Sequence, residues 1–388
     1  MAKRTPRSVT EALRQPVGRR RLLGGGALAG AGTALGLLGR GGPARAAPAR
    51  QDAETPLRVF ETSPLNAGTP LEQLSGLLTP NHLFFVRNHF AIPTIQSSDW
   101  TLTVDGAVAQ PLELSFDDVQ RLPSRSQVTL VECAGNARSG FTPRAEGTQW
   151  DTSAVGVAEW TGVPVAAVLE RAGLQPDAVE VVFHGGDNVG FQRSLSRDDV
   201  MDPDVILAYA MNGEPLPPEH GFPARLLVPG WIGVASVKWL ARIQAVTEPY
   251  TGFYQRSRYV IERENQQGDP EPATWLPVRA TIARPVANAS LAAGTVPISG
   301  FAYSGRGRVA SVEVSADAGA TWQPAALAPP NEPGSWARWQ LLWTAQPGRY
   351  TLVARATDEA GNRQPNQMEW NRFGYGYNAP WPVPVTVV

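Results

Sequence analysis

The order of hydrophobic and polar positions divides the chain into parts with different patterns. From residue 82 to about residue 259, short runs of apolar and β-branched residues predict strands at residues 83–86 (LFFV), 127–132 (QVTLVE), 179–183 (VEVVF) and 224–228 (ARLLV). Residues 163–172 predict a short helix that stops at Gly173, and Ser115 is a typical capping residue for a helix that begins after it. Strands mixed with helices in this way predict an α+β domain.

Residues 276–388 have a different pattern, made of strands and turns. Alternating apolar and polar residues predict strands at residues 296–300, 309–315 and 349–355, with turns at 317–319 and 358–362 between them. About 110 residues of this kind are typical of an all-β, immunoglobulin-like sandwich. The polar, proline-containing stretch at 263–275 predicts a linker to this domain from a first domain that spans residues 47–262.

Two shorter segments of the first domain also carry local signals. Residues 100–104 alternate between polar and apolar types and are followed by Asp105-Gly106, which predicts a hairpin that turns at this dipeptide. Residues 47–80 are rich in Pro, Thr and Ala, and we expect them to wrap the surface.

The first 46 residues predict an export signal. The arginines and leucines of residues 19–23 (RRRLL) are followed by an apolar run that extends to residue 38 and by the small-residue site 44–46 (ARA). This order is typical of a secretory signal, and adjacent arginines before leucines resemble a twin-arginine signal, which predicts a periplasmic or otherwise extracytoplasmic location. Cleavage at this small-residue site would follow Ala46, and the sequence leaves open whether it occurs. An uncleaved anchor is the alternative, but the run is rich in Gly and Ala and shorter than the ~20 apolar residues of a stable membrane span.

Composition narrows the class of protein. The 388 residues include 38 glycines and 35 prolines, which favours short elements with many turns and argues against a helical bundle. The single cysteine excludes an intrachain disulfide and any cysteine-built zinc or iron–sulfur cage within one chain. Residues 1–46 hold nine of the 34 Lys and Arg and one of the 35 Asp and Glu, so the rest has a net charge of −9 and no nucleic-acid-binding footprint.

The only thiol lies in a segment that suits metal chemistry. Residues 131–140 (VECAGNARSG) put Cys133 at the end of a predicted strand, before a glycine-containing loop and Arg138. A nearby arginine favours the thiolate, and a thiolate is a good ligand for a soft metal. The alternative is a small buried hydrophobe, which is the commonest environment of a free cysteine.

Four further segments, taken with the Cys133 segment, resemble one enzyme family. They are residues 84–89 (FFVRNH), 184–190 (HGGDNVG), 220–225 (HGFPAR) and 229–239 (PGWIGVASVKW). Together they resemble the sulfite oxidase family of molybdenum-cofactor enzymes over roughly residues 60–388. Residues 298–305 (ISGFAYSG) and 312–322 (VEVSADAGATW) are similar to that family's dimerisation domain, which implies a possible homodimer.

The resemblance implies a molybdenum–molybdopterin cofactor in which Cys133 is the sole protein ligand of the metal. It implies that the pterin and its phosphate are held by Phe85, Val86, Arg87, Asn88, His89, Asp187, His220, Arg225, Ser236, Val237 and Lys238. These residue types suit the task, because Arg and Lys match phosphate and Asp accepts from ring N–H groups. Lys238 is also the only lysine after Lys3 in a chain that otherwise uses arginine, which indicates a need for a compact ammonium group.

The resemblance further implies that sulfite is oxidised to sulfate by oxygen-atom transfer. Arg87 and Arg138 would offer planar donors to the oxyanion, and the Tyr259 hydroxyl would hydrogen-bond the substrate. The structural alternatives are an ion pair with a buried acid for Arg87 and a core position for Tyr259. His184 has no implied role and is expected to be structural.

Nothing in the chain resembles the haem domain of animal members, and a single cysteine excludes a CxxCH attachment site. We therefore expect no haem in this chain and transfer of electrons to a separate acceptor such as a c-type cytochrome. Phe373 stands at the position of an arginine that belongs to the anion pocket of animal members, with Arg372 one position away. Two alternatives thus stay open: a molybdenum oxidoreductase for a sulfoxide or another sulfur or nitrogen oxyanion, and a non-catalytic exported binding protein.

Overall fold

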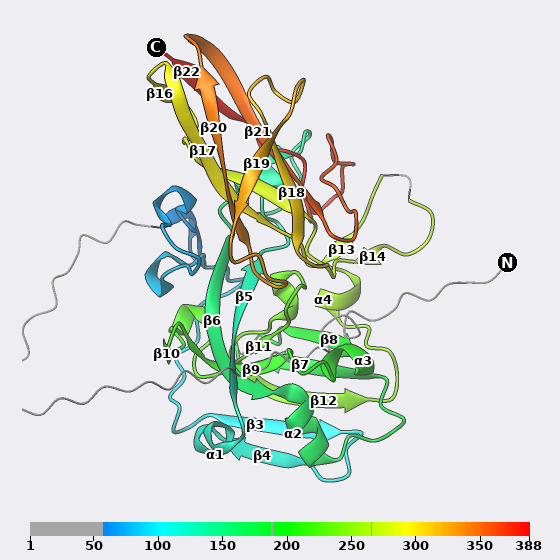
Figure 1. The fold of residues 1–388 in the computed structure, drawn as a ribbon. Coiled ribbons are helices and arrows are strands. Elements are labelled where there is room, and N and C mark those ends of the chain that lie inside the picture. The colour runs from blue at the N-terminus through cyan, green and yellow to red at the C-terminus, as the bar shows by residue number, and fades with distance from the viewer. Residues whose placement is uncertain (1–56, 188, 265) are drawn as a thin grey trace, which may run out of the picture. The chain divides into compact units, whose positions relative to one another are not determined.

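The computed structural model describes residues 57–187, 189–264 and 266–388. The predicted export signal, residues 1–46, lies outside the described residues. Residues 56–388 form one compact unit. Strands make up most of its regular structure (Figure 1), and the helices in the described part are short: α1 (Phe116–Arg121), α2 (Val165–Ala172), α3 (Arg197–Val200) and α4 (Phe253–Arg256). No helix in this part is long and apolar enough to cross a membrane.

Two five-stranded sheets form the first part. One has the order β4 (Leu112–Ser115), β3 (Thr101–Gly106), β12 (Leu240–Val246), β7 (Glu180–Gly185) and β8 (Gln192–Ser196). The other has the order β10 (Glu214–Pro215), β9 (Ile206–Met211), β6 (Val155–Pro164) and β5 (Arg125–Glu132), with β11 (Arg225–Leu227) also paired to β9. All pairs are antiparallel except β3 with β12. Strands far outweigh helices here, so the structure is mostly β, and the α+β prediction holds only in that short helices accompany the sheets.

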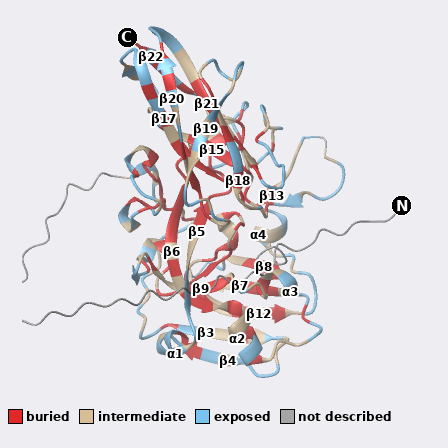
Figure 2. Ribbon diagram, viewed as in Figure 1, coloured by how far each residue is buried: buried red, intermediate tan, exposed pale blue. Residues whose placement is uncertain are grey.

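The two helix signals in the sequence act as predicted. Ser115 caps α1, because its Oγ accepts from the Asp118 amide at 3.2 Å while the Asp118 carboxylate accepts from the Ser115 amide at 3.0 Å. Gly173 ends α2 in the left-handed conformation, with φ of 71°. The buried face of α2, including Val168 and Leu169, packs into a core with β3, β7 and β12. Figure 2 shows that the strands over this core carry the buried residues.

The C-terminal part is a single eight-stranded array. Its order is β15 (Arg279–Arg284), β17 (Gly294–Tyr303), β20 (Ala337–Ala345), β19 (Gln323–Ala328), β18 (Val309–Ser315), β21 (Gly348–Asp358), β22 (Val383–Val387) and β16 (Ala289–Leu291). β15 also contacts β21, so the array folds over on itself around a core that includes Trp339, Trp343 and Leu352. The three strands predicted here are present as β17, β18 and β21.

One local prediction was wrong, and another holds only in part. Residues 83–86 form no strand: a short turn of 3-10 helix covers Asn81–Leu83, and only Val86 makes an isolated bridge, to Ala67. Their apolar side chains are buried in packing, which a strand pattern alone does not distinguish. The predicted hairpin is present as β3 and β4: their last paired residues are Val104 and Leu112, so the connection begins at Asp105-Gly106, although these two residues also pair with β12.

The predicted surface location of residues 47–80 holds only in part, and residues 47–56 lie outside the described residues. β1 (Arg58–Thr62) pairs with β2 (Leu65–Gly68), and residues 66–71 are buried. In the predicted linker, β14 (Glu271–Pro272) pairs with β13 (Val260–Ile261), so this stretch returns to the strand that follows Tyr259. The division into domains at 263–275 stays a prediction.

Candidate active site

The β5 strand ends at Glu132 and delivers Cys133 to a tight turn. The Cys133 amide donates to the Ala154 carbonyl at 2.9 Å, and the Asn136 amide donates to the Cys133 carbonyl at 2.9 Å. Cys133 is 9% exposed and lines a pocket with about 820 Å³ of empty space, including open solvent at its mouth. Cys133 is thus at a cavity wall rather than enclosed by aliphatic side chains.

Segments far apart in the sequence meet at this pocket. Twelve of the predicted site residues line it: Phe85, Arg87, Asn88, His89, Cys133, Asp187, His220, Arg225, Ser236, Val237, Lys238 and Tyr259. Val86 and Arg138 do not. Val86 is buried and pairs through its backbone with Ala67. His184 also lies outside the lining, bonded to Gln244 at 3.1 Å, as its expected structural role requires.

The pocket is lined by two cations, the buried Arg225 and the partly buried Lys238, that have no ion-pair partner among the described residues. Arg225 donates to the carbonyls of His220 and Ser236, at 3.0 and 2.9 Å, and its burial lowers its pKa to about 9. Lys238 donates to the carbonyls of Arg87 and Glu219, at 3.0 and 2.8 Å, and to the Asn88 side chain. Burial, and then Arg225 and Arg87, lower the pKa of Lys238 well below its ordinary value. These cations repel one another, so an anion bound between them would be stabilised.

His220 also lines the pocket, next to Arg225, which donates to its carbonyl. Its Nε2 is buried with no hydrogen-bond partner in the described part of the chain. Burial, followed by the charges of Lys238 and Arg225, lowers the pKa of His220 to about 3, so the ring is neutral near pH 7. A buried polar atom without a partner is costly, which indicates that this nitrogen meets a ligand atom.

The hydrogen bonds among three other residues of the pocket lining, Arg87, His89 and Tyr259, have a defined direction. Arg87 has only donors, so the His89 Nδ1 that lies 3.1 Å from its Nη2 must accept. Burial, and then the charges of Arg87 and Lys238, lower the pKa of His89 to about 3, so the ring is neutral and carries its proton on Nε2. His89 Nε2 lies 2.6 Å from Tyr259 Oη and donates to it. The phenol proton of Tyr259 therefore remains available to an acceptor in the pocket.

Arg138 lies behind the pocket wall. Its Nε donates to the Phe373 carbonyl at 2.7 Å and its Nη1 to the Thr148 carbonyl at 2.8 Å. Its guanidinium is 5.3 Å from the ring centre of Tyr375, which in turn stacks on Tyr259 with centroids 5.0 Å apart. The position makes Arg138 a support and a source of positive charge behind Tyr259. Its predicted direct contact with the substrate stays a prediction.

Backbone strain gathers around the same residues. Ala137, Trp239 and Tyr259 have φ of 62°, 51° and 55°, a region that residues other than glycine rarely adopt. Ala137 directly precedes the predicted site residue Arg138, Trp239 directly follows Lys238, and Tyr259 is itself a predicted site residue. Strained backbone that the surrounding structure maintains is a frequent feature of functional sites.

Comparison with known proteins identifies the family. A model of the oxidoreductase molybdopterin binding domain matches residues 89–254, and a model of the Mo-co oxidoreductase dimerisation domain matches residues 271–387. Sulfite oxidase of Gallus gallus is 34% identical over 370 residues, which cover 84% of this chain and 80% of that protein. The chain belongs to the sulfite oxidase family.

The names of further relatives state different substrates. Mitochondrial sulfite oxidase of Mus musculus is 36% identical over 359 residues; these cover 86% of this chain and 66% of that protein, so the chain spans about two thirds of its length. Nitrate reductase [NADH] of Solanum lycopersicum is 34% identical over 364 residues, covering 82% of this chain and 40% of that protein. The crystal structure of the sulfane dehydrogenase SoxCD from Paracoccus pantotrophus matches with a TM-score of 0.76 and 29% identity over 87% of each chain.

The residues present fit the molybdopterin cofactor of the family. Arg225, which is buried, and Lys238, which is partly buried, are suited to a phosphate, because neither pairs with a carboxylate of the described residues. The free His220 Nε2 and the Asp187 carboxylate, both on the pocket wall, suit a heterocycle with several hydrogen-bonding atoms. Cys133 faces the same space and suits a soft metal.

Two residues near the site were missed in the sequence. Asn66 lies on β2, and its Oδ1 accepts from the Asn88 amide at 2.8 Å and from Arg87 Nη1 at 3.2 Å, so it orients two residues of the pocket. Arg258 is stacked on the ring of Phe373, with 4.6 Å between the guanidinium carbon and the ring centre. Asn66 lies in a stretch predicted to be superficial, and no signal marks it. Arg258 directly precedes Tyr259, and that position is the one available hint.

Proposed function

We propose that this protein oxidises sulfite to sulfate with a molybdenum–molybdopterin cofactor and passes the electrons to a separate acceptor. The observation that carries the proposal is one pocket lined by a lone thiol, Cys133, by two cations without an ion-pair partner among the described residues, Arg225 and Lys238, and by Tyr259. The named function of the sulfite oxidase relatives supports sulfite as the substrate.

In this proposal the cofactor supplies the oxygen-atom transfer and accepts two electrons. Cys133 would ligate the metal. Arg225 and Lys238 would bind the phosphate, while His220 and Asp187 would bind the ring system. Arg225 donates to the Ser236 carbonyl and Lys238 donates to the Glu219 carbonyl, so the positions of these two cations are set before the cofactor binds.

The chain's own contribution to the reaction is to bind and orient a small oxyanion. Arg87 offers a fixed guanidinium, held by Asn66 and His89. Tyr259 offers a hydroxyl proton whose direction is set by the donation from His89 Nε2. Both groups stabilise negative charge on the oxyanion, and Arg138 adds positive charge from behind. Conversion of sulfite and water to sulfate releases two protons with the two electrons.

The main alternative to this proposal concerns the substrate. A related molybdenum oxidoreductase that acts on another sulfur or nitrogen oxyanion is favoured by the nitrate reductase relative and by the similarity to a sulfane dehydrogenase. The residues around Phe373 bear on this choice, because the stacked Arg258 supplies a cation beside the position where animal members have an arginine. We propose that Arg258 takes over part of that role for sulfite.

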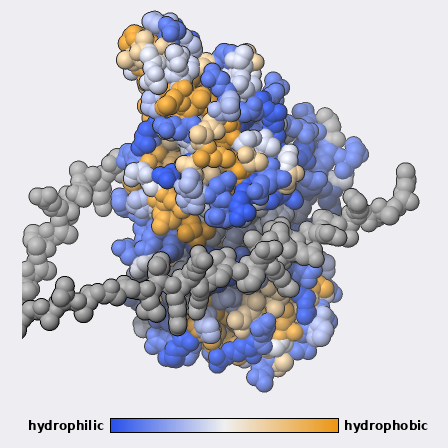
Figure 3. All heavy atoms as spheres, in the orientation of Figure 1, coloured by the Kyte–Doolittle hydropathy of each residue, from blue (hydrophilic) through white to orange (hydrophobic). Residues whose placement is uncertain are grey.

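The partners and location follow from the same proposal. A c-type cytochrome is the proposed acceptor, since the single cysteine leaves this chain without a CxxCH site. A homodimer through the C-terminal part is supported by the dimerisation-domain match and by exposed apolar side chains such as Leu342 of β20. Figure 3 shows hydrophobic atoms on the visible face over the region of β19 and β20. We propose an immunoglobulin-like sandwich for this part and twin-arginine export for the whole protein.

The deciding experiment combines metal analysis with turnover on purified protein. We expect close to one molybdenum per chain, sulfite-dependent reduction of cytochrome c, and no comparable oxidation of a reduced electron donor when nitrate or a sulfoxide is supplied as the electron acceptor. Cys133→Ser should fold, lose most of the metal and lose turnover, because the hydroxyl is a poor ligand for a soft metal. Metal-loaded protein without sulfite turnover would point to the alternative substrates, and folded protein with almost no molybdenum would point to a binding protein.

A further inference from the structure

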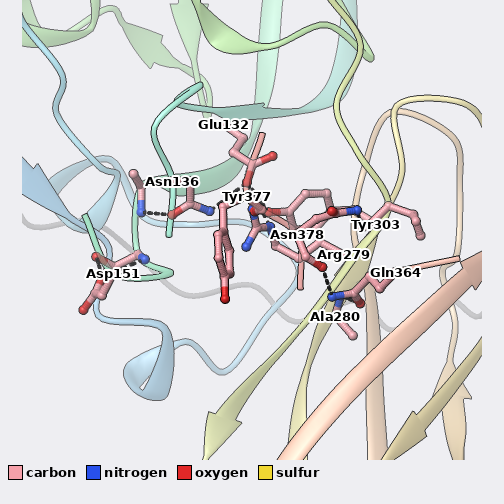
Figure 4. Close-up of polar contacts among 12 residues, drawn as sticks. Glu132, Asn136, Asp151, Arg279, Ala280, Tyr303, Gln364, Tyr377 and Asn378 are labelled. Carbon is pink, nitrogen blue, oxygen red and sulfur yellow. Dashed lines mark hydrogen bonds and ion pairs between the residues drawn. The ribbon is translucent and has the colours of Figure 1, made fainter. Parts of the chain in front are cut away.

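The C-terminal part of the chain reaches the turn that carries Cys133 through a buried ion pair. Arg279 of β15 lies 3.1 Å (Nε to Oε1) from Glu132, the last residue of β5, and the two side chains are 2% and 3% exposed. Figure 4 shows Arg279 and Tyr303 beside Glu132 and Asn136. We propose that Arg279 and Tyr303 are positioning residues for Cys133, because they fix the Glu132 carboxylate that holds the Cys133 turn. The proposal rests on the proposed function only for the thiol's role as metal ligand.

Glu132 is connected to the turn through Asn136. Glu132 Oε1 accepts from Tyr303 Oη at 2.8 Å and from Asn136 Nδ2 at 2.8 Å. Asn136 Oδ1 accepts from the Ala154 amide at 3.0 Å, while the Ala154 carbonyl accepts from the Cys133 amide at 2.9 Å. The carboxylate thus orients the side chain that closes the turn, and the closed turn sets the direction of the thiol.

Tyr303 contributes a donor that stays protonated. Burial, and then the neighbouring Glu132 carboxylate, raise the pKa of Tyr303 well above its ordinary value. Its hydroxyl therefore donates to Glu132 throughout the ordinary pH range. Arg279 and Tyr303 lie on the adjacent strands β15 and β17, which pair directly at these two residues, so one sheet edge supplies both contacts.

A second group of contacts holds the turn from residues near the C-terminus. The Gly376 amide donates to the Ala134 carbonyl at 2.9 Å, and the Phe373 carbonyl accepts from Arg138 Nε at 2.7 Å. The Tyr377 ring meets Phe141 with 4.9 Å between ring centres. The segment from Cys133 to Phe141 is therefore held on two sides by residues that follow it by more than 130 positions.

The electrostatics give a distinctive expectation. Removing Arg279 leaves the Glu132 carboxylate buried without its cation, and an uncompensated buried charge is strongly unfavourable. The structure can relieve this by opening at Glu132, which also releases Asn136 and the Cys133 turn. Removing both charges at once should restore the turn, because Glu132→Gln can still accept from Tyr303 and Asn136.

The test follows hydrogen exchange of the turn in the full chain, purified without cofactor. In Arg279→Met we expect the amides of Cys133 and Asn136 to exchange about tenfold faster than in the wild type, because local opening sets their exchange rate. In the double variant Glu132→Gln/Arg279→Met the rates should return to within about twofold of the wild type. Expressed with cofactor, Arg279→Met should retain less molybdenum, and the double variant should recover it.

A matched control is available in the same part of the chain. Arg355 of β21 pairs with Glu313 of β18 at 3.0 Å, away from the Cys133 turn, so Arg355→Met breaks an ion pair without touching Glu132. We expect it to leave the exchange of Cys133 and Asn136 unchanged. If Arg279→Met does not fold, Tyr303→Phe carries the test, with an expected increase of about fivefold from the loss of one donor to a buried carboxylate.

Three results would overturn the proposal: wild-type exchange at the turn in Arg279→Met, equal acceleration in Arg355→Met, or no recovery in the double variant. Failure of the proposed function has a different signature. A wild-type protein without molybdenum or sulfite turnover would refute that function, yet the exchange of the cofactor-free turn would still decide whether Arg279 and Tyr303 hold it.

Discussion

At the scale of single residues, the site depends on which atoms donate. Arg87 must donate to His89, a neutral His89 must then donate to Tyr259, and Tyr259 is left with a proton for the pocket. This series of hydrogen bonds begins at Asn66. Its side-chain Nδ2 donates to the Glu61 carboxylate, and its Oδ1 accepts from Arg87. A chain of fixed hydrogen bonds in this direction prepares a donor for an oxyanion before the oxyanion arrives.

Tyr259→Phe tests this donor. We expect the turnover of sulfite to fall about a hundredfold, as with the loss of one preorganised donor to a developing charge, while molybdenum content is unchanged. Steady-state kinetics and metal analysis on the same preparation measure both. Tyr377→Phe is the matched control, since that ring packs on Phe141 outside the pocket lining, and it should retain turnover. Equal losses in the two variants would show that the Tyr259 hydroxyl has no special part.

The low pKa of His220 predicts how stability depends on pH. The folded chain holds this ring neutral down to about pH 3, whereas an unfolded histidine takes up a proton below about pH 6.5. Unfolding therefore binds a proton between these values, so the free energy of unfolding must fall as the pH is lowered through this window.

We expect His220→Gln to remove up to ~1.4 kcal/mol per pH unit of this slope within the window. Denaturant unfolding of the cofactor-free chain at several pH values between 4 and 7 measures it, and the slopes are compared rather than the absolute stabilities. His82→Gln changes an exposed ring and serves as the control. A variant slope equal to that of the wild type would mean that His220 accepts a proton in the folded chain.

At the scale of elements, the site is built where strands end and loops cross. Cys133 follows β5, and the loop between β21 and β22 returns to pack against the residues after it. Gly374 in this loop has φ of 59° and lies so close that an added Cβ would be 2.6 Å from Arg138 Cγ and 2.7 Å from Ala145 Cβ. The absence of a side chain at Gly374 thus allows Arg138 to take its place behind Tyr375.

Gly374→Ala and Gly376→Ala form a matched pair. Both glycines have positive φ, at 59° and 69°, but an added Cβ at Gly376 meets nothing within 4 Å. We expect Gly376→Ala to cost about 1 kcal/mol for its backbone conformation alone. Gly374→Ala should cost a further ~1–3 kcal/mol from overpacking and should raise the KM for sulfite by displacing Arg138. Equal effects of the two variants on stability and KM would contradict the role given to this close approach.

At the scale of the whole molecule, the proposed catalytic residues lie in the first part of one compact unit, and some of the residues that support them lie in its C-terminal part. Residues 56–388 form that unit, and the fully buried Arg279–Glu132 pair joins the C-terminal strands to the strand that bears Cys133. The C-terminal part therefore does more for the site than a separate dimerisation module would. The N-terminal residues are the remaining part of the chain, and their proposed role is export.

Replacing Arg19, Arg20 and Arg21 by lysine tests the export proposal. We expect the variant to stay in the cytoplasm, because a twin-arginine signal is recognised by its arginines and not by positive charge alone. Cell fractionation followed by immunoblotting measures the location, and the mass of the exported wild-type protein reports whether cleavage follows Ala46. Changing Arg4 and Arg7 to lysine, outside residues 19–23, should not affect export. Normal export of the triple variant would contradict the export proposal.

The sequence by itself determined a minority of the strands and the two longest helices, and it named the residues for which a site is proposed. Its alternation predicted β18 over the residues observed, and the capping Ser115 and terminal Gly173 bound the two longest helices, because these signals act within a few residues. The resemblance identified twelve residues that line one pocket. The pattern failed at residues 83–86, where a buried irregular segment is as apolar as a strand.

Tertiary structure alone decided what lies behind those residues. Asn66, Arg258 and Arg279 act across separations that no local pattern encodes, and Arg138 is turned away from the pocket by carbonyls of residues that follow it. The direction of the His89–Tyr259 hydrogen bond likewise depends on burial, which removes the proton that an exposed histidine would gain. Local signals set strands and caps, whereas burial, charge pairing and donor direction exist only once distant segments have met.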